Sequence, residues 1–214
     1  MKIQIITLFP EMFEGVFGTS MLWKATKDGA VEYSCINLRD FGLGPRKTVD
    51  DTPYGGGDGM LLMIEPLMKA VETAKVNDPT AKVLLMTPRG NFWKQSTAKS
   101  YADAKQGLII ICGRYEGYDE RIVSVVHEQI CIGNYVLTGG ELAAMIITDS
   151  IVRLLPGVLG GENSAEIESF VADDTTIEAP HYTRPADYKG MKVPEVLLNG
   201  NHAAIDTWRA ENAK

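Results

Sequence analysis

The chain has 214 residues, of which 45% are hydrophobic, a formal net charge of -7 and a pI near 5.0. This composition is typical of one good-sized globular domain with a small appendage. It argues against a broad positive surface for gripping nucleic acid, because such domains usually have a pI above about 9. No apolar run approaches the roughly 20 residues of a membrane span, and the N-terminus lacks a signal-peptide core. We therefore expect a cytoplasmic protein with no membrane partner.

In chain order the first 160 residues alternate apolar runs with helical patterns. The order of strand and helix implies a parallel sheet covered by helices on both faces, an α/β fold. The expected elements are a strand over 3–9, a helix from Glu11, a strand over 31–38, a helix over 66–75, a strand over 82–86, a helix over 91–105, a strand over 108–112, a helix over 119–128, a strand over 130–137 and a helix over 141–155.

The amino-acid composition of the chain changes after Gly160. Residues 161–178 are rich in acidic side chains and contain no lysine or arginine, which predicts a mobile linker or lid. Residues 179–214 form a short segment with a helix expected over 201–212. This segment is too small to be confidently stable alone, so we expect it to pack on the main domain, 1–160, or on a second subunit.

Two glycine-bearing segments, 112–117 and 132–142, each follow an apolar run and lead into a helical pattern. Glycine leaves bare backbone where a side chain would obstruct a small ligand, and loops at the ends of parallel strands are a usual place for such a ligand. The sequence therefore predicts a small-molecule pocket built from these loops.

Several familiar sites are missing from the sequence. There is no G-x-G-x-x-G after the first strand, no P-loop and no G-x-S-x-G nucleophile elbow. Cys35, Cys112 and Cys131 match no paired metal spacing and are predicted to be reduced thiols. Asp50, Asp51 and Asp58 do not follow the calcium-loop pattern. We therefore predict no metal site. A flavodoxin-like enzyme is also disfavoured, because the phosphate loop expected after its first strand is absent.

Many short sequence motifs are spread along the chain and are informative when taken together. They are LFPEMF at 8–13, RD at 39–40, TVDD at 48–51, PYGGG at 53–57, CGRYEG at 112–117, DER at 119–121, IGNYVLTGGEL at 132–142, PGVLG at 156–160, PHYTRP at 180–185, LL at 197–198, GNHA at 200–203 and WR at 208–209. In this order they resemble the bacterial tRNA (guanine-N1)-methyltransferases of the TrmD type, a SPOUT-class family with a trefoil knot. The resemblance covers nearly the whole chain.

The resemblance implies transfer of a methyl group from S-adenosyl-L-methionine to N1 of guanine 37 of tRNA, next to the anticodon. It also implies a deep trefoil knot at the C-terminal end of domain 1–160 and a homodimer whose active site is shared between subunits. By the same likeness the cofactor would be held by Thr87, Pro88, Gly113, Tyr115, Glu116, Ile132, Gly133, Asn134, Tyr135, Val136, Leu137, Gly139 and Gly140.

The likeness also assigns catalytic residues. Guanine N1 must lose a proton as the methyl arrives, and negative charge then develops on O6, so a base and a fixed cation are needed. Arg153 would supply the cation and Glu168 the base. Relatives have Asp-Ser-Phe where this chain has Glu168-Ser169-Phe170. The alternative function is therefore a SPOUT-type S-adenosylmethionine-binding protein with lost or altered transfer activity.

The anticodon arm of tRNA is the expected partner, and the residues that would contact it are Asp50, Tyr54, Arg184 and His202. The chain ends soon after Trp208 and Arg209, where relatives continue through further helices, so we expect a weaker hold on the RNA. Magnesium is implied by the resemblance alone, since no residue cluster specifies a cation cage.

Overall fold

The computed structural model describes residues 1–160 and 168–214, and these fall into two compact units, 1–160 and 161–214. The division lies at Gly160, where the first predicted domain ends. The first part of the acidic segment predicted as a lid, residues 161–167, lies outside the described residues, and its role as a lid stays a prediction.

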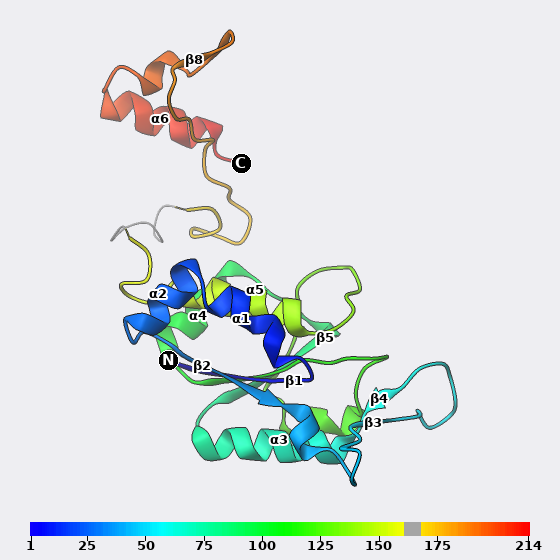
Figure 1. Ribbon diagram of the computed structural model, residues 1–214. Coiled ribbons are helices and arrows are strands. Elements are labelled where there is room, and N and C mark those ends of the chain that lie inside the picture. The colour runs from blue at the N-terminus through cyan, green and yellow to red at the C-terminus, as the bar shows by residue number, and fades with distance from the viewer. Residues whose placement is uncertain (161–167) are drawn as a thin grey trace. The chain divides into compact units, whose positions relative to one another are not determined.

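The first unit contains a five-stranded parallel sheet with the order β2-β1-β6-β5-β7 (Figure 1). The prediction of a parallel α/β fold is confirmed. A flavodoxin-like sheet would keep its third and fourth strands in sequence order, whereas here β6 lies between β1 and β5. The strands are β1 (Lys2–Thr7), β2 (Glu32–Asn37), β5 (Lys82–Phe92), β6 (Leu108–Ile111) and β7 (Glu128–Cys131).

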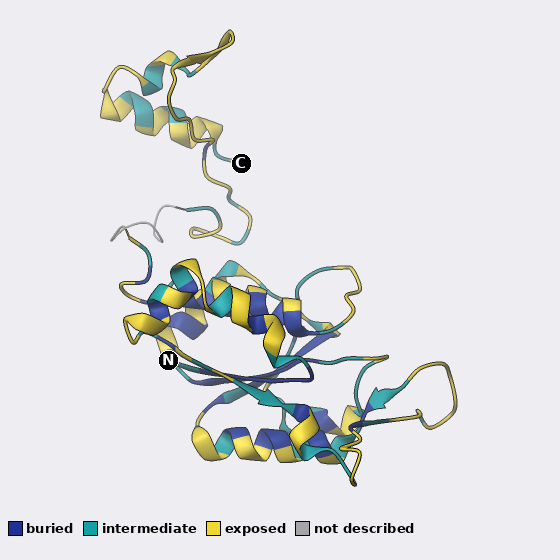
Figure 2. Ribbon diagram, in the orientation of Figure 1, coloured by how far each residue is buried: buried dark blue, intermediate teal, exposed yellow. Residues whose placement is uncertain are grey.

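The sheet has a hydrophobic core on each face because alternate side chains of a strand point to opposite sides. All four residues of β6 are buried, with Leu108 and Ile110 in one core and Ile109 and Ile111 in the other. Burying each such side chain contributes about 1.5–3 kcal/mol. Figure 2 shows the central strands in dark blue between helices with exposed outer sides.

Helices cover both faces, as the sequence predicts. The helices α2, α4 and α5 pack in the first core, and α3 packs in the second, on the opposite side of the sheet (Figure 1). The helical elements of this unit are η1 (Pro10–Phe13), α1 (Glu14–Phe17), α2 (Ser20–Lys27), η2 (Leu38–Phe41), α3 (Ile64–Asn77), α4 (Gln95–Ala104), η3 (Glu120–Val125) and α5 (Glu141–Val152).

Four predicted elements around β5 and β7 have wrong boundaries. The strand expected over 82–86 is β5, which continues to Phe92. The helix expected over 91–105 begins only at Gln95, because Asn91 and Phe92 extend β5 and pair with Ile130 and Cys131. The helix expected over 119–128 is the short 3-10 helix η3, which the Asp119 side chain caps through the N–H of Arg121 at 3.0 Å.

The strand expected over 130–137 is instead β7, Glu128–Cys131. Its first residues pair with Leu84 and Leu85, near the start of β5. After Cys131 the chain leaves the sheet, and Tyr135 N–H donates to the Gly133 carbonyl at 2.9 Å to form a turn. The apolar residues after Tyr135 therefore belong to the loop rather than to a strand.

Small hairpins were not foreseen from the sequence. In the first unit β3 (Asp50–Asp51) pairs with β4 (Leu61–Leu62) and encloses the glycine-rich loop. In the second unit β8 (Asp187–Tyr188) pairs with β9 (Met191–Lys192). The second unit also contains η4 (Glu195–Leu197) and the expected C-terminal helix, α6 (His202–Asn212), whose N-terminus is capped by the Asn201 side chain.

A substitution at Gly90 tests the close packing of β5 against β7. The β5–β7 register shifts between Met86 and Asn91, and a Cβ on Gly90 would lie 2.3 Å from the Ile130 nitrogen. We expect Gly90→Ala to lower the free energy of unfolding by about 2 kcal/mol or more, because rigid backbone must move. Urea denaturation measures this. The control is Gly15→Ala in α1, where no described atom lies within 4 Å of the added methyl. Equal midpoints for the two variants would contradict the packing.

Candidate functional site

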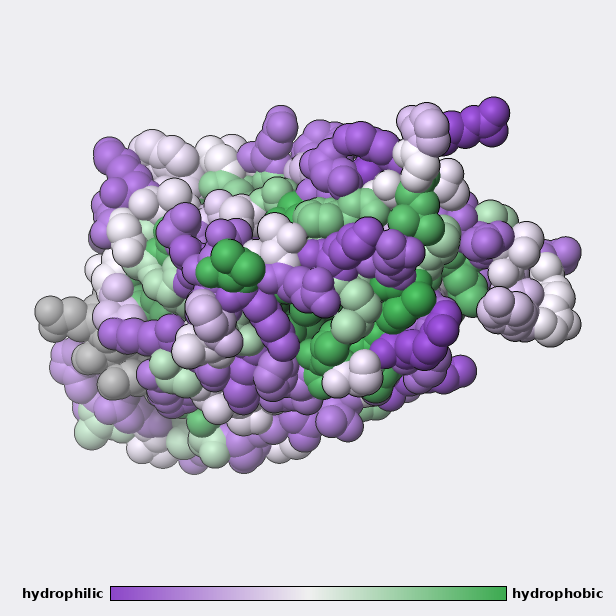
Figure 3. Space-filling model, turned by 90° about the horizontal axis from the view of Figure 1, so that it is seen from below, coloured by the Kyte–Doolittle hydropathy of each residue, from purple (hydrophilic) through white to green (hydrophobic). Residues whose placement is uncertain are grey.

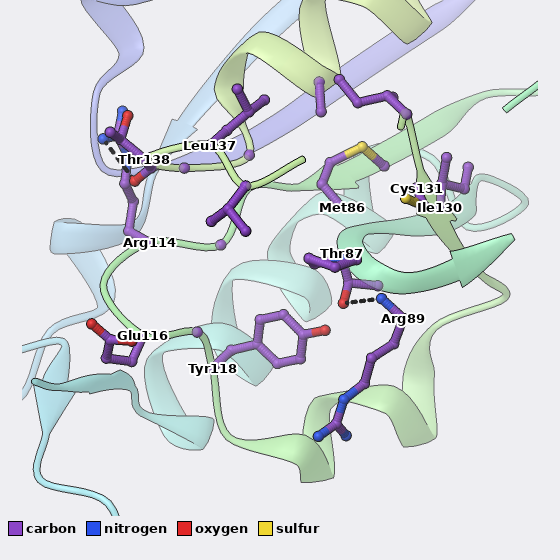
Figure 4. A pocket seen from close by; sticks show the side chains of 18 of the residues that line it. Met86, Thr87, Arg89, Arg114, Glu116, Tyr118, Ile130, Cys131, Leu137 and Thr138 are labelled. Carbon is purple, nitrogen blue, oxygen red and sulfur yellow. Dashed lines mark hydrogen bonds between the residues drawn. The ribbon is translucent and has the colours of Figure 1, made fainter. Parts of the chain in front are cut away.

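A cavity of about 520 Å³ opens where the ladders of β5, β6 and β7 end. It is lined by residues 86–89, 113–118, 130–133 and 135–140, together with Leu61, Glu120 and Ala143. Both glycine-bearing loops therefore meet at one site, at the carboxyl ends of parallel strands where α/β sheets commonly bind ligands. Figure 4 shows the side chains around this cavity.

All but one of the cofactor residues predicted from the sequence line this cavity. The exception is Asn134, which is exposed and lies outside the lining. Several lining residues were missed, although most of them lie directly beside a predicted one in the chain. Those that lack this signal reach the cavity only through the fold, and they are Leu61, Tyr118, Glu120, Ile130 and Ala143. These missed residues are Leu61, Met86, Arg89, Arg114, Gly117, Tyr118, Glu120, Ile130, Cys131, Thr138 and Ala143.

The cavity has an apolar wall and a polar wall. Met86, Ile130 and Leu137 supply apolar side chains to the first. On the second, Arg89 Nη1 lies 3.5 Å from a carboxylate oxygen of Glu120. The Tyr118 hydroxyl points toward Thr87 in Figure 4. Burial raises the pKa of Tyr118, although its hydrogen bond to Thr87 opposes that change. The hydroxyl is therefore neutral and available as a donor near neutral pH.

The two glycine-bearing loops touch backbone to backbone. The Gly140 N–H donates to the Gly113 carbonyl at 2.9 Å, and a Cβ on Gly140 would lie 2.8 Å from the Cys112 Cα. Only glycine allows this approach. Tyr115, at the mouth of the cavity, has φ of 60°, in the left-handed region that residues with side chains rarely adopt. Such strained positions often cluster at ligand sites.

Two cysteines lie at the inner end of the loops. Cys131 lines the cavity, and its thiol donates to the Gly133 carbonyl at 3.2 Å. Cys112 is fully buried, and burial raises the pKa of its thiol well above the usual value, with a further contribution from Glu141. Cys112 is therefore a packed thiol rather than a nucleophile.

The predicted catalytic residues belong to different units. Arg153 follows the last turn of α5, and its N–H donates to the Asp149 carbonyl at 3.0 Å. Glu168 is the first described residue of the second unit. Their joint role in catalysis stays a prediction.

The predicted RNA-binding residues are also divided between the units. Asp50 lies on β3 and Tyr54 follows it, fully exposed, in the glycine-rich loop. Arg184 and His202 are exposed in the second unit, where His202 is the first residue of α6. Their contact with RNA stays a prediction.

On the face seen in Figure 3, apolar side chains form a recessed patch bordered by hydrophilic ones. In the part of the chain that the structure describes, no helix is long and apolar enough to cross a membrane. Within the same residues, no three His, Cys, Asp or Glu side chains are gathered as a metal cage.

Comparison with known proteins identifies the family. The family model "tRNA (Guanine-1)-methyltransferase TrmD" matches residues 1–214. The chain belongs to this family. It is 54% identical over 211 residues to the tRNA (guanine-N(1)-)-methyltransferases of Bacillus cereus (strain AH820) and Bacillus anthracis (strain A0248), covering 98% of this chain and 85% of each relative. The resemblance inferred from the sequence is confirmed.

A solved structure supports the same membership. The crystal structure of the tRNA (m1G37) methyltransferase from Aquifex aeolicus is 37% identical and superposes with a TM-score of 0.80, covering 97% of this chain and 87% of that one. The TrmD fold therefore extends over nearly the whole length of this chain.

Gly140 tests whether the cavity depends on the contact between its loops. In Gly140→Ala the added methyl meets backbone of Cys112 and Gly113, so the loops must separate. We expect the affinity for S-adenosylmethionine, the donor that the family resemblance implies, to fall about tenfold or more, because a displacement on the order of 1 Å disturbs the contacts that both loops would make with it. Titration calorimetry measures the affinity. In the control, Gly160→Ala, no described atom lies within 4 Å of the methyl. Unchanged affinity in Gly140→Ala would contradict the role of the contact.

Proposed function

We propose that this chain transfers a methyl group from S-adenosyl-L-methionine to N1 of guanine 37 of tRNA. The observation that carries the proposal is the single cavity in which the two glycine-bearing loops meet, in a chain that matches the TrmD family along its whole length. The reaction takes place in the cytoplasm, where tRNA is available, and the three free cysteines agree with a reducing compartment.

The cavity fits the methyl donor. Its volume, about 520 Å³, lies within the range of roughly 300–1,000 Å³ common for small-molecule sites. The apolar wall of Met86, Ile130 and Leu137 suits a flat purine, and the exposed backbone of the loops offers groups for its polar edge. Hydroxyls of Thr87 and Tyr118 suit the sugar. When bound, the donor supplies an electrophilic methyl group that needs no further activation.

The remaining chemistry belongs to side chains. Glu168 accepts the proton of guanine N1, and the Arg153 guanidinium stabilises the charge that develops on O6. Glutamate and aspartate both end in a carboxylate, so the replacement keeps a group that can accept a proton. Glutamate is longer by one methylene, and the backbone at 168 must accommodate that length. The mechanism includes no step through magnesium.

We also infer that the strand exchange reflects a trefoil knot. The chain forms β5, returns to form β6 between β5 and β1, and then forms β7 on the far side of β5. A loop threaded through another brings backbones into close contact, and the close approach of Gly140 to Gly113 supports this inference. Folded chains rarely thread one loop through another, so a knot here would be an exception to the general rule.

The RNA lies against groups from both units in this proposal. Asp50 and Tyr54 are carried by the β3–β4 hairpin, whose exposed aromatic ring is suited to stacking on a base. Arg184 and His202 add a cation and a hydrogen-bonding ring from the second unit. With a net charge of -7, the contact must be local.

The protein acts as a homodimer in this proposal. Leu142 and Ile146 are exposed by 49% and 47%, and they lie one turn apart on the outer side of α5. Met12, on the neighbouring η1, is exposed by 37%. Apolar stripes of this kind are typical of faces that a second copy covers.

Glu168→Gln tests the base. The amide keeps the shape of the side chain but cannot accept the proton, so we expect the rate to fall about a hundredfold or more, with unchanged affinity for S-adenosylmethionine. Glu168→Asp should remain active. Initial rates on an unmodified tRNA transcript measure this, with a transcript carrying adenine at position 37 as the blank. Full activity of the glutamine variant would show that Glu168 is not the base. An inactive parent with an active aspartate variant would favour the donor-binding alternative.

Ile146→Asp tests the dimer. A carboxylate at the centre of the stripe must be desolvated when two copies meet, so we expect a monomer with little methyl transfer. Sedimentation equilibrium measures the mass. The matched control is Val76→Asp on α3, an equally apolar residue that is 80% exposed on another helix. A variant that stays dimeric would contradict the proposed interface.

A further inference from the structure

A largely buried ion pair lies beside the cavity, with side chains exposed by 1% for Glu141 and 17% for Arg114. Glu141, the first residue of α5, is fully buried, and its Oε2 lies 2.9 Å from Nε of Arg114. The two atoms are close but not aligned for a hydrogen bond. Its other oxygen, Oε1, accepts a hydrogen bond from the Thr7 hydroxyl at 2.8 Å. Burying such charges is costly, and pairs of this kind are often no more stabilising than apolar residues of similar size.

Arg114 is surrounded by contacts from separate segments. Its guanidinium lies 4.5 Å from the Phe9 ring, in a cation–π contact. One terminal nitrogen donates to the Thr138 carbonyl at 3.3 Å, as Figure 4 shows, and the other to the Met12 sulfur at 3.2 Å. The LFPEMF segment at 8–13 has no role in the proposed chemistry. Through Phe9 and Met12 it contacts this arginine and holds it in place.

The pair joins the two loops that form the cavity. Arg114 belongs to loop 113–117, whereas Thr138 and Gly139 belong to loop 132–140, and Glu141 begins the helix that follows. A Cβ on Gly139 would lie 2.4 Å from the Arg114 Nε, so the side chain fills the space between the loops. The position of Arg114 therefore sets how far apart the loops lie.

We propose that Glu141 is a positioning residue for the methyl donor. Its charge and its hydrogen bond to Thr7 fix Arg114, and Arg114 holds the two loops at the separation that the donor requires. This inference rests on the proposed function of the cavity. It assigns the costly buried pair to preorganisation of the site rather than to stability.

The proposal predicts which kinetic constant changes. Without the pair, the loops of the free protein spread over more arrangements, and the donor must order them when it binds. The KM for S-adenosylmethionine should therefore rise about tenfold, while kcat at saturating donor changes less than about threefold, because Glu168 and Arg153 are untouched.

The decisive variant removes both charges at once. In Arg114→Met/Glu141→Gln no unpaired charge remains buried, so we expect a thermal midpoint near that of the parent. Donor affinity, measured by calorimetry, should stay about tenfold weaker. The single variants should lose both stability and affinity. A double variant that regains full affinity along with stability would overturn the proposal.

The matched control repeats the chemistry at an exposed ion pair. Lys69 and Glu65 lie one turn apart on α3 with 2.8 Å between their charged atoms, away from the residues that line the cavity. We expect Lys69→Met/Glu65→Gln to leave both donor affinity and the thermal midpoint unchanged. Weaker donor binding in this control would mean that removing charges, rather than positioning, explains the effect.

A smaller change keeps the test valid if the double variant does not fold. Thr7→Val keeps a side chain of similar size and removes two hydrogen bonds of the Thr7 hydroxyl, the one it donates to Glu141 and the one it accepts from the Phe9 N–H. Both bonds support the surroundings of Arg114, and we expect donor affinity to fall about threefold. Affinity equal to that of the parent would overturn the proposal. A parent protein that does not bind S-adenosylmethionine would instead refute the proposed function itself, so the two failures are distinguishable.

Discussion

The contact between the backbones at Gly113 and Gly140 is the constraint on which the rest of the site depends. It joins the loop after β6 to the loop after β7, and a single methyl group at Gly140 would not fit. The cavity and the Arg114–Glu141 ion pair are arranged around this contact. In the sheet β5 lies between β6 and β7, so the loops that follow these two strands meet across the width of one strand.

The sheet and most of the cavity were predictable because their signals are local. Runs such as Leu108–Ile111 can only be buried strands or short buried helices, and the flanking glycines decide between them. The strand order was not predictable from periodicity, since β5 and β6 have similar apolar patterns.

The wrong boundaries have a common cause. Pro88, Gly90 and Asn91 are residue types that strands disfavour, yet β5 continues through them to Phe92 because the partner residues Ile130 and Cys131 lie beside its end. Long-range pairing therefore decides their structure, as it often overrides local propensity. The Arg114–Glu141 pair could not be predicted for the same reason. Its partners Thr7 and Thr138 are far apart in the sequence and come together only in the folded chain.

Hydrogen exchange of the amides with and without S-adenosylmethionine tests the central claim, that the two loops form one donor site. The account predicts that amides of 113–117 and 132–140 become protected together and to a similar degree, while those of α3 do not change. Protection confined to one loop, or to residues away from the cavity, would contradict it.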